Sequence, residues 1–117
     1  MLKRLILVAA IAALSGCDSP ADQAERAQIL VQVDAHLALK NRLRDPDSAD
    51  ITDTRIDATN RIVCGAFRAR NGFGGMAYLQ NYIWRAGAVT LRKDEGDQQF
   101  QKLWRSTCDP LPQPTTP

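Results

Sequence analysis

The first seventeen residues decide in which compartment the rest of the chain folds. Lys3 and Arg4 precede ten mostly apolar residues, 5–14, and the small residues Ser15 and Gly16 follow. A positive start, an apolar segment of this length and small residues before a break are typical of a secretory signal. Ten helical residues span about 15 Å, half of the roughly 30 Å core of a bilayer, so we expect no permanent transmembrane anchor.

The end of this leader, Leu14-Ser15-Gly16-Cys17, resembles the cleavage box of bacterial lipoproteins. In that family the signal is removed just before the cysteine, which then carries the acyl chains. The resemblance implies that residues 1–16 are a signal peptide, that Cys17 is lipidated and that residues 17–21 form a short tether. Asp18 resembles the residue with which enterobacterial lipoproteins avoid the outer membrane. It favours the inner membrane, and the outer membrane stays open. The alternative is a plain secretory signal with an incidental Cys17.

Cys64 and Cys108 remain once Cys17 is assigned to lipid, and an even pair in an oxidising compartment predicts a disulfide. It would close a loop of about 45 residues and stabilise the fold by about 4 kcal/mol on the chain-entropy model. A zinc pair or a catalytic thiol is the alternative. Zinc needs about four ligands and His36 is the only histidine, so we expect no metal site and no cofactor.

Apolar periodicity predicts a single α+β domain over residues 22–109, followed by a Pro-rich disordered tail at 110–117 that buries little. An N-terminal helix over 22–43, capped by Asp18 or Asp22, and a short C-terminal helix are expected to pack on one face of a three- to four-stranded antiparallel sheet, with one disulfide. Ile29, Leu30, Val33 and Leu37 form the apolar stripe of the first helix. The second helix is expected at 97–106, and strands are expected at 51–56, 61–70, 76–85 and 88–93.

In the strand at 61–70, Val63, Gly65, Phe67 and Ala69 alternate with Ile62, Cys64, Ala66 and Arg68, so the two sets lie on opposite faces. In the strand at 76–85, Tyr78, Tyr82 and Trp84 lie on one face with Met76 and Gln80. These aromatic residues are either core under a helix or an exposed interface.

The segment Asn71-Gly72-Phe73-Gly74-Gly75 predicts a hairpin connection between the second and third strands. Its glycines could hold an anion on backbone amides, but no Lys-Ser/Thr follows, as a phosphate loop requires. Phe73 either projects from the tip, where it would anchor a partner, or folds back on the sheet. Arg68 and Arg70 form a basic patch beside it or pair with nearby aspartates. We take these seven residues, 71–75 with 68 and 70, as the candidate partner-binding site.

Charge and motifs exclude several functional classes. Two of the 15 basic side chains lie before Cys17, which leaves 13 against 13 acidic ones, so the body is neutral and we expect no nucleic-acid partner. The acidic run from Asp45 to Asp57 lacks the spacing of a calcium loop. His36 is expected at the helix surface or the edge of the core. No catalytic pattern is found, so we expect no enzyme.

Two further resemblances concern the body of the chain. Residues 43–49 (LRDPDSA) and 63–76 (VCGAFRARNGFGGM) resemble the LKDPDSA opening and VCGEVNAKNSFGGY core of a small domain of bacterial and phage proteins, and Trp104 and Cys108 match its closing Trp and Cys. This implies one folded unit with a disulfide and transfers no catalytic residue. Gly74-Gly75 and Trp84-Arg85-Ala86-Gly87 resemble, more weakly, segments of periplasmic inhibitors of C-type lysozyme.

These features favour a lipid-anchored, non-enzymatic binding or accessory protein on the periplasmic face of a Gram-negative membrane. Its expected partners are the membrane, through the lipid, and a protein of the envelope. Two alternatives stay open: an inhibitor or immunity protein against a lytic enzyme such as lysozyme, and a structural lipoprotein of a secretion or conjugation assembly. The sequence leaves the identity of the partner and the oligomeric state open.

Overall fold

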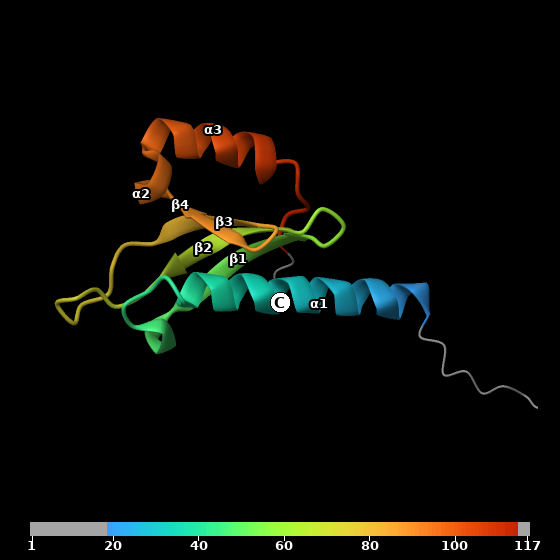
Figure 1. The fold of residues 1–117 in the computed structure, drawn as a ribbon, viewed down its shortest axis with the longest axis horizontal. Helices are drawn as coiled ribbons and strands as arrows, with labels where there is room; N and C mark the ends of the chain where they lie inside the picture. Colours follow the sequence, from blue (N-terminus) through green and yellow to red (C-terminus); the bar gives the residue numbers. More distant parts are fainter. Residues whose placement is uncertain (1–18, 115–117) are drawn as a thin grey trace, which may run out of the picture.

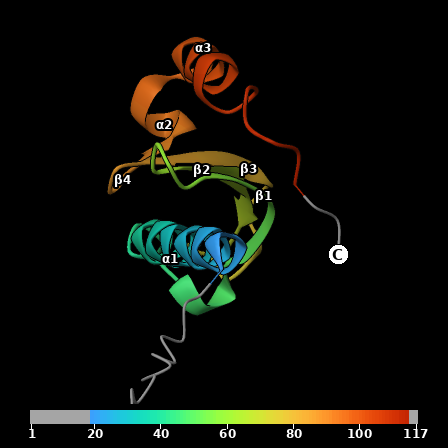
Figure 2. The ribbon, with the colours of Figure 1, turned by 90° about the vertical axis from the view of Figure 1, so that its right-hand side faces the viewer.

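Residues 19–114 are described by the computed structural model, and they form a four-stranded antiparallel sheet with helices on both faces (Figures 1 and 2). The strands follow one another in chain order: β1 (Asp50–Asp57), β2 (Ile62–Arg68), β3 (Gln80–Arg85) and β4 (Ala88–Leu91). The helices are α1 (Pro20–Lys40), α2 (Arg92–Glu95) and α3 (Asp97–Thr107), with a 3₁₀ turn at Pro46–Ser48. This confirms the predicted α+β fold.

Strand β2 supplies apolar side chains to both faces of the sheet, as its alternation predicts. Val63 and Phe67 pack with α1 in one core, and Ile62 and Cys64 pack with α3 in a second core. The expectation that both helices share one face is therefore wrong. Because β2 is apolar on both faces, each face needs its own cover.

Helix α1 begins two residues earlier than expected and ends three residues earlier, at Lys40. Ser19 caps its first turn by accepting a hydrogen bond from the Asp22 N–H at 3.2 Å, and Pro20 occupies the first helical position, where no N–H is needed. The predicted cap Asp22 therefore contributes its backbone and not its carboxylate; Asp18 lies outside the described residues. No helix within residues 19–114 has the length and apolarity to cross a membrane.

The predicted apolar stripe of α1 does not face the sheet. The helix buries Ala35 and Leu39, whereas the stripe of Ile29, Leu30, Val33 and Leu37 lies on its outer side. The core under α1 already holds large side chains of the sheet (Phe67, Tyr82 and Trp84). The small Ala35 side chain lets the helix lie close to these rings, and we attribute the orientation to that fit.

The disulfide between Cys64 and Cys108 is confirmed, with a Cα–Cα distance of 5.9 Å. It joins β2 to the end of α3, which also packs Phe100 against this face. The third and fourth strands are shorter than predicted, because residues 76–79 are not strand and β4 ends at Leu91. The Asp94 carboxylate accepts a hydrogen bond from the Leu91 N–H at 2.8 Å, which starts the unpredicted helix α2.

Leu111, which was expected in the tail, is buried in the core under α3. Its N–H donates to the Cys108 carbonyl at 3.0 Å, so the chain turns back against Ile62 and the disulfide. The folded part therefore extends beyond residue 109.

A pair of truncations tests this boundary. Deleting residues 111–117 removes a buried leucine and is expected to cost about 2 kcal/mol, a drop of roughly 8–16 °C in Tm for a domain of this size. Deleting residues 113–117 leaves Leu111 in place and should leave Tm nearly unchanged. Equal Tm values for the two truncations, measured by thermal unfolding, would contradict the burial of Leu111.

His36 lies at the edge of the core under α1. Its ring packs edge to face on the Tyr82 ring, with 6.5 Å between the ring centroids. Its Nε2 is buried and has no hydrogen-bond partner among the described residues. Burial, followed by the charge of Lys40, lowers the pKa of His36 below its usual 6.5. Burial also raises the pKa of Tyr82 to about 12; the Thr54 side chain opposes this rise, although the contact falls short of hydrogen-bond geometry.

The lowered pKa of His36 makes folding sensitive to mild acid. The unfolded chain binds the proton first, so the His36 contribution to stability is fully present well above pH 6.5 and falls as the pH drops through 6.5 toward the folded pKa. We expect the free energy of unfolding to decline between pH 7.5 and 5.5, with a slope below about 1.4 kcal/mol per pH unit. His36→Phe keeps the ring and should flatten the profile in urea titrations. An unchanged slope in His36→Phe would show that another group is responsible.

Candidate functional site

The segment between β2 and β3, residues 69–79, projects beyond the end of the sheet (Figure 1). We call it the tip loop. A bridge between Arg70 and Met76 closes its base, and the Ala77 N–H donates to the Ala69 carbonyl at 2.9 Å. The predicted connection at 71–75 therefore forms the end of a longer loop.

Asn71 organises the end of the tip loop. Its N–H donates to the Gly75 carbonyl at 2.8 Å, and its own carbonyl accepts from Gly74 at 3.1 Å. Its side-chain Oδ1 accepts from the Phe73 N–H at 3.0 Å and the Gly75 N–H at 3.3 Å. Gly74 has a φ of +82°, which a residue with a side chain adopts only under strain. These interactions hold the backbone under Phe73 in one defined turn.

Phe73 points away from the protein, with 99% of the residue exposed. This decides between the two orientations that the sequence left open. Tyr78 is 92% exposed, and Met76 and Leu79 are about half exposed. Single exposed apolar residues are common on protein surfaces, but four within seven residues concentrate exposed apolar side chains on one loop, as is frequent at interfaces.

The aromatic face predicted for the third strand is divided by the structure. Tyr82 and Trp84 are buried under α1, whereas Tyr78 belongs to the tip loop. The strand begins only at Gln80, so the period-two pattern does not extend to residue 78.

Basic side chains surround the base of the tip loop. Arg68 pairs with Asp50 at 3.5 Å, as the alternative for this residue predicted, and both side chains are half exposed. The backbone N–H of Arg70 donates to the Ser48 hydroxyl at 2.8 Å. Arg44 lies beside the loop: its Nη1 is 2.6 Å from the position that a Cβ of Gly72 would occupy. Within residues 19–114, Arg44 and Arg70 form no ion pair with a carboxylate.

A groove of about 260 Å³ lies at this base. We call it the basic groove. Its walls come from the end of β2, from the tip loop, from the segment after α1 and from the start of α2. They include Arg42, Arg44, Phe67, Arg70, Ala77 and Lys93. Four of these side chains are cationic, so the groove suits an anionic group with an apolar neighbour.

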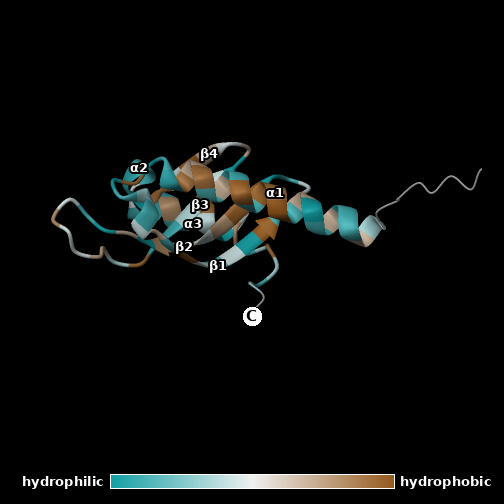
Figure 3. Ribbon diagram, turned by 90° about the horizontal axis from the view of Figure 1, so that it is seen from below, coloured by the Kyte–Doolittle hydropathy of each residue, from teal (hydrophilic) through white to brown (hydrophobic). Residues whose placement is uncertain are grey.

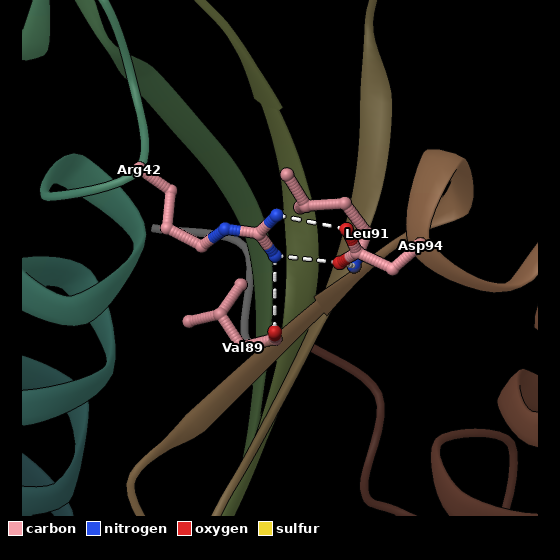
Figure 4. A network of polar contacts seen from close by, with 4 residues as sticks. All are labelled: Arg42, Val89, Leu91 and Asp94. Carbon is pink, nitrogen blue, oxygen red and sulfur yellow. Dashed lines mark hydrogen bonds and ion pairs between the residues drawn. The ribbon is translucent and has the colours of Figure 1, made fainter.

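An ion pair fixes the segment after α1 against the sheet (Figure 4). The Arg42 guanidinium contacts both carboxylate oxygens of Asp94, at 2.5 and 2.8 Å, and donates to the Val89 carbonyl at 3.1 Å. The hydrogen bonds that Asp94 accepts from Arg42 and from the Leu91 N–H hold its pKa well below its usual range. The charge of Arg42 is therefore balanced, and Arg44, Arg70 and Lys93 provide the positive charge of the groove.

A larger cavity, of about 430 Å³, lies between α1 and the turn after β1. Among the described residues of its walls, Asp57 is the only titratable one, and hydrogen bonds from Asn60 lower the pKa of this carboxylate. The described residues of its walls therefore bring no second titratable side chain together with Asp57.

The remaining sequence candidates are the acidic run and Cys17; the run adjoins the site where Asp50 pairs with Arg68. The aspartates from Asp45 to Asp57 are spread over the 3₁₀ turn and β1, and residues 19–114 contain no group of His, Cys, Asp and Glu able to hold a metal ion. Cys17 lies outside the described residues. Arg44 and Lys93 were missed by sequence reasoning, because only the folded chain brings them to the loop.

No family model matches the chain, and searches of curated proteins and of solved structures return no match. Function is therefore proposed from the sequence and from the geometry of the described residues.

Proposed function

We propose that this protein is a lipid-anchored binding protein of the bacterial envelope, which faces the periplasm and recognises a protein partner through the tip loop. The observation that carries the binding role is the fully exposed Phe73 on a loop that Asn71 holds in one conformation. A rigid loop loses little conformational entropy on binding, so an exposed aromatic side chain on it makes an efficient anchor.

The basic groove indicates the chemistry of the partner. The body of the chain is neutral, yet Arg44, Arg70 and Lys93 line the groove beside the tip loop, and within residues 19–114 none of the three forms an ion pair with a carboxylate. The partner surface is therefore acidic around an apolar pocket for Phe73. Complementary charges of this kind speed association and exclude partners of the wrong sign.

The anchor rests on the resemblance of residues 14–17 to the lipoprotein cleavage box. Its test is incorporation of labelled palmitate into the full chain in a Gram-negative host. We expect label in the natural protein and none in Cys17→Ser, which should also leave the membrane fraction because one residue holds the acyl chains. Label that persists in Cys17→Ser, or membrane retention without label, would contradict the anchor.

The binding role is tested by placing a photo-crosslinking residue at position 73 of the full chain and irradiating intact cells. We expect one discrete adduct, reduced about tenfold or more when Arg44→Glu and Arg70→Glu are added, because charge reversal repels an acidic partner. The matched control reverses two exposed charges of α3, Lys102→Glu and Arg105→Glu, and should leave the adduct intact. An adduct that ignores the groove reversal, or responds equally to the control, would contradict the proposal.

Inhibition of a lytic enzyme is a second candidate, favoured by the shape and charge of the loop. Glycosidases place a pair of carboxylates in an open cleft, and a projecting loop flanked by arginines is complementary to such a cleft. Two measurements separate this candidate from an accessory role: the identity of the partner cross-linked at position 73, and the activity of a lytic enzyme mixed with an excess of the purified protein. Undiminished lysis would remove it.

A further inference from the structure

A third cavity lies on the face of the sheet that α3 covers. Figure 3 views the molecule from the side of α1, so the sheet and α3 lie behind that helix. The cavity has a volume of about 170 Å³ and lies between the start of β3, the start of α2 and one side of α3. We call it the α3 cavity. It shares no wall residue with the basic groove, so it is a separate candidate site.

Two aromatic rings form the apolar wall of the α3 cavity. Phe100 and Trp104 lie one turn apart on α3, with 6.3 Å between their ring centroids. Phe100 is 1% exposed and fixes this side of the helix in the core, whereas Trp104 is half-buried. An aromatic surface held in place at an opening is a typical wall for a ligand that is itself a ring.

Polar side chains line the rest of the α3 cavity. Arg92 pairs with Asp97 outside the cavity walls, at 3.5 Å. Within residues 19–114 the other polar side chains of the walls form no hydrogen bond or ion pair with another residue; they are Asn81, Gln101, Arg105 and Asp109. Two amides, a guanidinium and a carboxylate together offer several donors and several acceptors to a ligand.

The charges and the volume limit the class of ligand. Asp97 balances Arg92, and Arg105 and Asp109 carry opposite charges, so the walls favour neither an anion nor a cation. A purely apolar ligand would cover these polar groups without pairing them, which costs free energy. The volume is below the about 300–1,000 Å³ of sites for drug-sized molecules, so it accommodates one ring and not a nucleotide.

We propose that the α3 cavity binds one ring of an uncharged saccharide. The apolar C–H face of the ring packs on Trp104, and its hydroxyl groups, each a donor and an acceptor, pair with Asn81, Gln101 and Asp109. In the bacterial envelope the source of such a ring is a sugar unit of the cell wall. That source rests on the proposed function, whereas binding in the cavity depends on neither the anchor nor the tip loop.

Intrinsic fluorescence tests this site, because the chain has two tryptophans: Trp104 lines the cavity and Trp84 is 1% exposed. The purified full chain, in a detergent without sugar groups, is titrated with tri-N-acetylglucosamine. We expect a saturable change in fluorescence with a Kd on the order of 1 mM, as suits a ligand that contacts the protein through one ring. Trp104→Phe keeps an aromatic ring in the core and should abolish the change, because the remaining Trp84 is buried.

Two wall variants and a matched control complete the test. Asn81→Ala and Gln101→Ala remove exposed side chains, so circular dichroism should be unchanged while each raises the Kd about fivefold or more. Gln99→Ala removes the same side chain from the opposite side of α3 and should keep the natural Kd.

Three results would overturn the saccharide site. One is a fluorescence change that persists in Trp104→Phe or a Kd that Gln99→Ala shifts as much as Gln101→Ala. The second is the absence of saturation at about tenfold the expected Kd. The third is saturable binding of benzoate, an aromatic anion, by a chain that does not respond to the sugar. None of these results changes the cross-link expected at position 73, so the two proposals fail separately.

Discussion

The alternation of apolar side chains in β2 sends Val63 and Phe67 to one face of the sheet and Ile62 and Cys64 to the other. Both faces must then be covered, so α1 and α3 lie on opposite sides. Helix α3, which covers the second face, is short. The disulfide from Cys64 to Cys108 compensates by fixing the end of α3 directly to β2. The tip loop continues from the same strand and starts from a backbone that is held on both faces.

The site at the tip depends on a second link. The ion pair between Arg42 and Asp94 ties the segment after α1 to the start of α2, and this holds Arg44 and Lys93 near the base of the loop. The exposed Phe73 at the end of the tip loop and the cationic side chains at its base thus belong to one end of a body without net charge. The exposed apolar side chains on the outer side of α1 form a surface separate from the tip loop.

Local pattern in the sequence was enough for the strands of the sheet core, for the disulfide and for the turn at 71–75. The sequence pattern predicted the wrong side of α1, which is apolar on two sides. Its more apolar stripe faces outward, because the side with the small Ala35 and with Leu39 fits against the sheet. The basic groove could not be predicted from the sequence, because Arg44, Arg70 and Lys93 are far apart in the chain and meet only in the fold. The exposure of Phe73 depends on the side-chain bonds of Asn71, which the turn motif does not specify.

We expect a partner in the envelope to cover the exposed apolar side chains of the tip loop. Hydroxyl-radical footprinting measures this directly, because Phe73, Met76 and Tyr78 are reactive and their oxidation rates follow solvent access. The half-buried Leu103 on α3 serves as the internal reference. We expect Phe73 and Tyr78 to oxidise several-fold more slowly in the intact envelope than in the purified protein, relative to Leu103. Equal relative rates in the two preparations would contradict the account.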